Sequence, residues 1–177
     1  AITMRTLKHF LLAVFLLQLS ACGIFKTTTS TSDLPTDDGK IDIVFLQMND
    51  VYEISPLEGG KVGGMARVAN IRESLLAQNP NTLTILAGDF LNPSLIGTIK
   101  YEGKRIKGKQ MVEVMNMMGV DMVAFGNHEF DLKEAELQER LNESKFEWIG
   151  TNVLHVKDGK KQPFVKQTAN GEQAVPK

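Results

Sequence analysis

Between residues 41 and 149 the chain alternates short β-rich runs with longer segments of helical spacing, and this alternation restricts its fold most. The β-rich runs are 41–48, 82–87, 120–125 and 146–149. Apolar residues recur at intervals of three and four in the segments 64–78, 108–118 and 132–142, which predicts helices there. Strands joined by crossover helices lie parallel in one sheet, so the order predicts an α/β layered fold with buried strands.

Polar groups follow three of these runs at the point where each run ends. Asp50 comes directly after the first run and Asp89 follows the second, while Asn127 and His128 follow Gly126 at the end of the third. The carboxyl ends of parallel strands meet along one edge of a sheet, so we expect these four polar side chains to converge there. Two carboxylates, an amide and an imidazole suit divalent metal ions. The pattern therefore predicts a site for two such ions.

The stretch after the third run also has a purely structural interpretation. Asp131 is typical of a helix N-cap, and Glu134, three residues later, would complete a capping box. That alternative accounts for Asp131 and Glu134 but leaves Asn127, His128 and Glu129 unexplained. We therefore favour a functional site.

Apolar side chains on the helical segments are expected to pack against the sheet. Methionines at helical spacing more often fill a core than bind a metal. The residues assigned to the core are Met65, Val68, Ile71, Leu75, Leu76, Met111, Val114, Met115, Met118, Leu137 and Leu141. The basic stretch 100–109 is interpreted as a solvated loop, with a phosphate-facing role as the alternative.

Composition disfavours several other classes of protein. The 177 residues carry a formal net charge of −1 at pH 7 and 7% aromatic residues, so no basic surface indicates nucleic-acid binding. A single cysteine excludes an internal disulfide. No Gly-x-Gly-x-x-Gly sequence follows any of the β-rich runs, which disfavours a nucleotide-cofactor domain.

Residues 1–22 have the pattern of a targeting segment. Two basic residues precede the apolar run 10–19, which is too short to span a membrane comfortably. Leu19-Ser20-Ala21-Cys22 resembles a bacterial lipobox, in which the cysteine is lipidated. We expect the protein to be exported and anchored through Cys22, either at the periplasmic face of an outer membrane or at the cell surface. The polar residues 23–40 are expected to form a disordered tether.

The spaced polar motifs resemble those of a known family. Asp50, Gly88-Asp89 and the stretch Gly126-Asn127-His128-Glu129-Phe130-Asp131 look like the first three metal motifs of the calcineurin-like metallophosphoesterases. Asn49 before Asp50, and Thr151-Asn152-Val153 after the fourth run, make the chain similar to the bacterial 5′-nucleotidase and UDP-sugar hydrolase branch. The resemblance covers about residues 41–155, and it rests on the combination, since Gly-Asp or Asn-Asp alone is not specific.

The resemblance implies a role for each matching residue. Asp89 matches the aspartate that bridges two divalent ions (Zn, Mn, Mg or Ca), Asp50 a ligand of the first ion and Asn127 a ligand of the second. His128 matches the histidine that steadies the phosphoryl oxygens or the leaving group, so His128 and Asn127 are the expected catalytic residues. The implied fold is a layered α/β sandwich. The implied reaction is hydrolysis of nucleotide phosphomonoesters by a water that the metals activate.

The sequence departs from the family pattern at two sets of expected metal ligands. Tyr52 stands where the family usually has a histidine ligand of the first metal, and a phenol with an ordinary pKa of about 10 is a weaker candidate ligand. The family takes further ligands from later histidines, whereas this chain has only His9, His128 and His155.

The family's nucleoside-binding carboxyl-terminal domain also has no counterpart in the sequence. We therefore expect residues 41–177 to be the amino-terminal part of a metallophosphoesterase domain, incomplete at the carboxyl end and weak or inactive alone. The alternative is a non-catalytic surface-binding lipoprotein that reuses the fold, with Tyr52 marking the loss of a metal.

Overall fold

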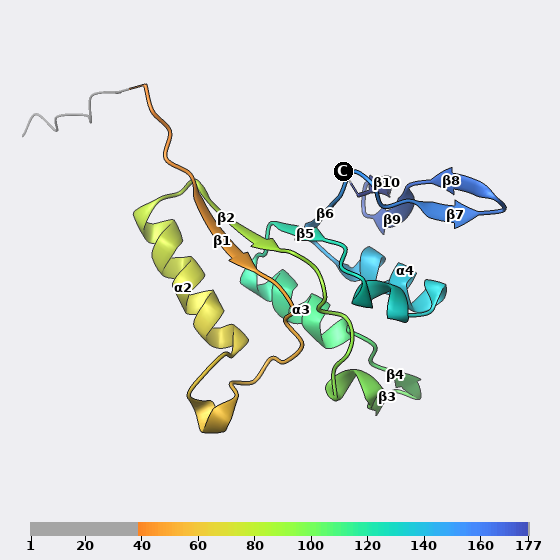
Figure 1. Cartoon of the computed structure of the whole chain (residues 1–177), viewed down its shortest axis with the longest axis horizontal. Helices are drawn as coiled ribbons and strands as arrows, with labels where there is room; N and C mark the ends of the chain where they lie inside the picture. The colour runs from red at the N-terminus through yellow and green to blue at the C-terminus, as the bar shows by residue number, and fades with distance from the viewer. Residues whose placement is uncertain (1–38, 177) are drawn as a thin grey trace, which may run out of the picture. The chain divides into compact units, whose positions relative to one another are not determined.

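The computed structural model of the chain describes residues 39–176, and its larger compact unit begins at Ile41 (Figure 1). The targeting segment 1–22 with Cys22, and nearly all of the tether 23–40, lie outside the described residues and stay predictions. Within residues 39–176, no helix combines the length and the apolar character that crossing a membrane requires.

A four-stranded sheet forms the centre of this unit. Its strands are β1 (Val44–Met48), β2 (Thr82–Leu86), β5 (Met122–Ala124) and β6 (Glu147–Ile149). All neighbours are parallel and their spatial order follows the chain order. The predicted parallel α/β arrangement is therefore confirmed, although all four strands are shorter than their β-rich runs, by one to three residues.

Helices connect these strands as the apolar spacing predicted. They are α2 (Met65–Gln78), α3 (Lys109–Met118) and α4 (Glu134–Glu143), and Figure 1 shows them on the same side of the sheet. Three short 3-10 helices precede or separate them: η2 (Glu58–Gly60), η3 (Ile96–Thr98) and η4 (His128–Asp131). The helix α3 ends at Met118, and its C-cap Gly119 has a φ of 70°, the left-handed conformation that glycine adopts without strain.

The helices bury one face of the sheet at β2, β5 and β6, while the β1 residues on that face are half-buried. Thr84 and Leu86 on β2, Val123 on β5 and Trp148 on β6 all have 0% exposure and point to that face. Met111 and Met115 of α3, and Leu141 of α4, are equally buried in the same core. The core assignment is therefore right for α3 and α4. In α2 it is right for Met65 and wrong for Ile71, which is 48% exposed, while the other three assigned residues are half-buried.

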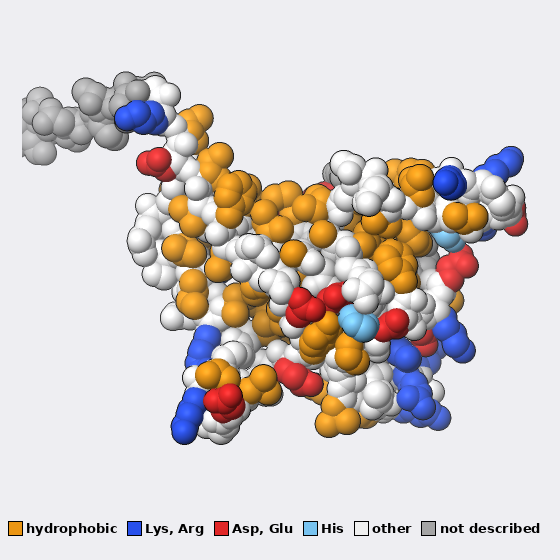
Figure 2. Space-filling model, viewed as in Figure 1, with side chains coloured by type: hydrophobic (Ala, Val, Ile, Leu, Met, Phe, Trp, Pro, Cys, Tyr) orange, Lys and Arg blue, Asp and Glu red, His pale blue; other side chains and the backbone are white. Residues whose placement is uncertain are grey.

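The opposite face of the sheet is apolar but incompletely covered. The strand register places Phe45 beside Leu83 and Ile85 beside Met122, so these four side chains share this open sheet face. Phe45 is 60% exposed, and Ile43 before it is 53% exposed. Figure 2 shows hydrophobic side chains gathered over β1 and the neighbouring strand. The prediction that β1 is a buried strand is therefore wrong, because helices cover its sheet on one side only.

Two stretches of the chain form hairpins that the sequence did not predict. The basic stretch 100–109 contains the pair β3 (Lys100–Tyr101) and β4 (Lys104–Arg105), so it is not simply a loop. After β6 the chain forms β7 (His155–Lys157) with β8 (Lys160–Gln162), and β9 (Phe164–Thr168) with β10 (Gly171–Val175). Lys166 on β9 donates to the Phe146 carbonyl at 3.1 Å, which ties the second hairpin to the start of β6.

Candidate functional site

The ends of β1, β2 and β5 meet at one edge of the sheet. The Asp50 N–H donates to the Gly88 carbonyl at 3.2 Å, which joins the loop after β1 to the loop after β2. The His128 N–H donates to Asp89 Oδ1 at 2.8 Å, which joins the loop after β2 to the turn after β5. Asn127 is exposed beside His128 at the start of η4. Asp50, Asp89, Asn127 and His128 therefore lie on adjoining loops, where the strand order predicted them.

The two aspartates sit on strained backbone. Asp50 has φ 54° and Asp89 has φ 59°, both in the left-handed region that residues other than glycine seldom occupy. Such strain costs about 1–3 kcal/mol per residue and is concentrated at functional sites. Glycine is needed beside Asp89, because a Cβ on Gly88 would lie 2.6 Å from the Gly126 Cα. The loops after β2 and β5 thus approach each other more closely than side chains allow.

His128 forms a pair with Asp131 inside the turn η4. His128 Nδ1 lies 2.7 Å from Asp131 Oδ2, and Asn92 Nδ2 donates to the same oxygen at 3.0 Å. The hydrogen bond that His128 donates to Asp131 raises the pKa of His128, and the hydrogen bonds that Asp131 accepts from His128 and Asn92 lower the pKa of Asp131. The pair is therefore held as imidazolium and carboxylate over a widened pH range.

The helix-cap interpretation of Asp131 and Glu134 is wrong. Asp131 belongs to η4, while Lys133 occupies the N-cap position of α4. The Lys133 N–H is accepted by Glu136 at 3.0 Å, so Glu136, not Glu134, satisfies the helix start. The sequence signal for the real partnership was the three-residue spacing of His128 and Asp131, which one 3-10 turn brings together.

We expect Asp131→Asn to lower the pKa of His128 toward the ordinary histidine value of about 6.5. The raised pKa in the wild-type chain means that the proton on His128 stabilises the fold at low pH, and that this contribution is lost as pH rises through the raised pKa. An NMR titration of the imidazole C–H signals measures both values. Glu134→Gln, which changes a carboxyl next to His155 instead, serves as the control. Equal His128 pKa values in wild type and Asp131→Asn would contradict the pairing.

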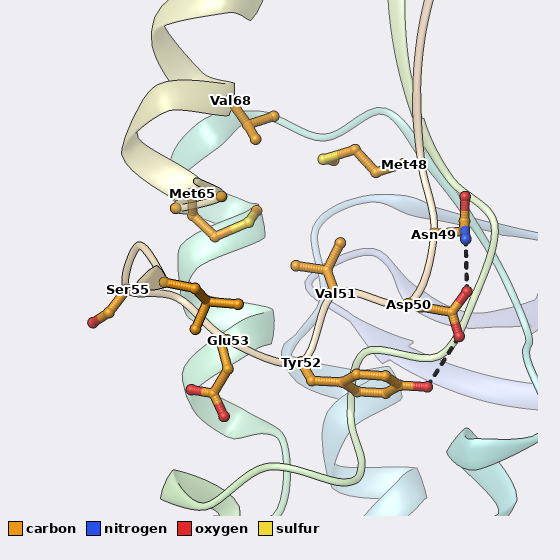
Figure 3. Close-up of a pocket in the computed structure, with 12 residues that line it drawn as sticks. Met48, Asn49, Asp50, Val51, Tyr52, Glu53, Ser55, Met65 and Val68 are labelled. Carbon is orange, nitrogen blue, oxygen red and sulfur yellow. Dashed lines mark hydrogen bonds between the residues drawn. The ribbon is translucent and has the colours of Figure 1, made fainter. Parts of the chain in front are cut away.

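Asp50 already has a partner at each carboxylate oxygen. Asn49 Nδ2 donates to Oδ2 at 2.6 Å and the Tyr52 hydroxyl donates to Oδ1 at 3.0 Å (Figure 3). The bonds from Asn49 and Tyr52 lower the pKa of Asp50. Partial burial and the bond to Asp50 raise the pKa of Tyr52 to about 12. Tyr52 is therefore a neutral hydrogen-bond donor near pH 7, and it directs its proton at Asp50 Oδ1.

The donors at this edge fit part of a metal site. Asp50, Asp89 and Asn127 supply the oxygen ligands that hard divalent cations prefer. Within residues 39–176, however, no three His, Cys, Asp or Glu side chains cluster closely enough to hold an ion. Glu129, which the helix-cap interpretation left unexplained, is fully buried and bonded to backbone N–H groups.

Comparison with known proteins identifies the family. Residues 43–170 match the family model described as calcineurin-like phosphoesterase. The chain belongs to this family. The resemblance drawn from the motifs is thereby confirmed, and with it a phosphohydrolase function for the family and the use of divalent metal ions by its members.

Several nucleotidases are among the relatives. A snake venom 5′-nucleotidase of Gloydius brevicauda is 33% identical over 125 residues, which cover 65% of this chain and 20% of that protein. A 2′,3′-cyclic-nucleotide 2′-phosphodiesterase/3′-nucleotidase of Yersinia enterocolitica is 30% identical over 153 residues, covering 81% of this chain and 23% of that protein. The chain therefore spans about a fifth of the length of these relatives.

Solved structures share the fold. A 5′-nucleotidase precursor of Thermus thermophilus superposes with a TM-score of 0.54 at 23% identity, over 67% of this chain and 27% of that one. A calcineurin-like phosphoesterase of Bacillus subtilis superposes with a TM-score of 0.52 at 24% identity, over 75% of this chain and 46% of that one. The parallel sheet and its helices are thus the α/β architecture of metallophosphoesterases.

Proposed function

We propose that this chain carries part of the active site of a metal-dependent phosphohydrolase of 5′-nucleotidase type, acting on nucleotide phosphomonoesters. The observation that carries the proposal is the direct bond between the loops of Asp89 and His128, within the segment that matches the family. The 5′-nucleotidases among the relatives support the choice of substrate class.

Each residue of the edge has a distinct task in the proposed reaction. Asp89, Asp50 and Asn127 would hold two divalent ions, whose chemistry is to activate a water and to neutralise phosphoryl charge. The His128 N–H fixes one oxygen of Asp89, so the carboxylate has a defined direction. The His128 ring, whose pKa the hydrogen bond to Asp131 raises, is suited in its protonated form to stabilise negative charge on a phosphoryl oxygen or to protonate a leaving oxygen.

We also propose that residues outside this chain complete the enzyme. The open sheet face carries apolar side chains such as Phe45, which a folded protein normally covers. The described residues contain no closed set of metal ligands, and the relatives extend far beyond the matched segment. The chain alone is therefore expected to bind metal weakly and hydrolyse little. The export and lipid anchoring proposed from residues 1–22 would place such an enzyme outside the cytoplasm.

The test is metal-dependent release of phosphate from 5′-AMP, measured with Mn²⁺, Zn²⁺, Mg²⁺ and Ca²⁺. It uses the 177-residue chain and the longest product that its gene encodes. We expect hydrolysis by the longer product, and a loss of at least about 100-fold in Asp89→Ala, because removing a ligand disorders the ions. Asp42→Ala, which changes an exposed aspartate before β1, is the matched control. Absence of turnover in both forms with all four metals would refute the proposal.

A second candidate is a non-catalytic surface-binding protein, and the bond from Tyr52 to Asp50 favours it. That bond places a proton where the first metal would bind. Tyr52→His separates the two candidates, since imidazole is a ligand at neutral pH. A gain in Mn²⁺ affinity and activity in the longer product would support an enzyme with a weakened first site. An unchanged, metal-free and inactive protein would favour the binding role.

A further inference from the structure

Glu129 is a buried carboxylate with an unusual set of partners. Its side chain has 0% exposure inside η4. Oε2 accepts the N–H groups of Asp89 at 2.9 Å and Gly126 at 2.7 Å. Oε1 accepts the N–H groups of Phe90 at 2.9 Å and Leu91 at 3.2 Å. Four backbone donors therefore converge on one side chain.

This arrangement satisfies the hydrogen-bonding needs of the buried carboxylate and of the buried N–H groups at the same time. An isolated buried carboxylate is strongly disfavoured, and it is tolerated where hydrogen bonds replace its water shell. The N–H groups of Phe90 and Leu91 lie in the core, where a backbone donor also needs a partner. Removing the carboxylate oxygens would leave such donors unpaired, which destabilises the fold.

The four donors come from the two loops that build the site. Asp89, Phe90 and Leu91 follow β2, whereas Gly126 follows β5. Glu129 thus clamps the loop after β2 to the turn after β5. Asp89 is held on both sides of its Cα: its N–H by Glu129, and its Oδ1 by the N–H of His128 from the same 3-10 turn. This double attachment accounts for the left-handed φ of 59° at Asp89.

We propose that Glu129 is a positioning residue that fixes the backbone and carboxylate of Asp89 for a divalent cation, and that it is not itself a metal ligand. The inference rests on the proposed metal-dependent function. It assigns the glutamate of the Asn127-His128-Glu129 stretch to the support of the site, and it explains why this residue faces the core while its neighbours face the edge.

The test compares Glu129→Gln with the wild-type chain by two independent readouts. Glutamine keeps the shape but turns an acceptor oxygen into an NH₂ group that faces N–H donors. In amide hydrogen exchange we expect protection to fall at Asp89, Phe90, Leu91 and Gly126, and to persist in α3. In Mn²⁺ titrations followed by NMR line broadening at the site, we expect affinity to fall about 10–100-fold, as for other residues that support metal ligands.

Two control variants separate positioning from simple destabilisation. Glu136→Gln removes a carboxylate that accepts one N–H at the start of α4, so it should leave Mn²⁺ affinity unchanged. Leu141→Ala lowers stability through the core, at a residue of α4 with 0% exposure. If Leu141→Ala weakens Mn²⁺ binding as much as Glu129→Gln does, the positioning role is wrong.

The outcomes also distinguish this inference from the proposed function. Unchanged amide protection in Glu129→Gln overturns the clamp whatever the metal does. If millimolar Mn²⁺ broadens the NMR signals of Asp89 and His128 neither in the wild-type chain nor in the longer product, the metal-dependent function and the cation part of the inference are overturned. Selective loss of protection together with loss of Mn²⁺ affinity supports both.

Discussion

Replacing Gly126 with alanine is expected to weaken Mn²⁺ binding at least about 100-fold and to destabilise the fold by about 2 kcal/mol or more. The new Cβ would overlap Asp89 Oδ1 and lie 2.6 Å from the Asp89 backbone nitrogen. Overpacking of this kind costs about 1–3 kcal/mol because backbone has to move. A displacement of about 1 Å at a catalytic group can cost about 100-fold in activity. The single methyl group that Gly126→Ala adds should therefore displace the Asp89 carboxylate from the position in which it would bind an ion.

Isothermal titration with Mn²⁺, on the longer product if the chain alone binds too weakly, measures the first effect, and urea denaturation measures the second. Gly97→Ala is a suitable control, since a Cβ there would meet its nearest atoms at 3.8 Å, an ordinary contact distance. We expect Gly97→Ala to keep both wild-type Mn²⁺ affinity and wild-type stability. A Gly126→Ala variant that binds Mn²⁺ as tightly as wild type would show that the loops after β2 and β5 can separate without consequence for the site.

The site could be predicted from the sequence because its residues directly follow strands. A strand end fixes where the next residues lie, and parallel strands bring their ends to one edge. Asp50, Asp89 and His128 could be placed together from that rule alone, and the hydrogen bonds between their loops agree with it. The helices α3 and α4 were predictable for the same reason, since their apolar spacing points to one buried face.

What the sequence could not supply depends on partners far along the chain. Glu129 is a residue type that often binds metal ions. Its place in the core depends on the N–H groups of Phe90 and Leu91, which donate to its carboxylate. Phe45 is a residue type that is usually buried, but it is 60% exposed because nothing in the described part of the chain fully covers it. The hairpin of β7 and β8 consists mostly of exposed polar residues, so it had no hydrophobic alternation to reveal it.

Replacing Trp148 with alanine is the second large effect that we expect, a loss of about 3–5 kcal/mol in the free energy of unfolding. Trp148 has 0% exposure on β6 and its ring centroid lies 4.4 Å from that of Phe125 and 5.8 Å from that of Phe90. Its Nε1 donates to Ser144 Oγ at 2.9 Å. The substitution therefore removes a large apolar contact and one hydrogen bond together. Urea denaturation followed by circular dichroism measures the change, and the thermal midpoint should fall by roughly 10–15 °C.

Two variants divide this loss into its parts. Ser144→Ala removes the partner of Nε1 while the ring stays, so it should cost about 1 kcal/mol. Met117→Ala, at a side chain with 87% exposure, should change stability by no more than about 0.5 kcal/mol. A Trp148→Ala loss no larger than that of Ser144→Ala would contradict the packing argument. The Trp148 ring packs on Phe125, which immediately precedes Gly126 and the turn that carries His128. Removing the Trp148 ring should therefore loosen the site before the sheet unfolds.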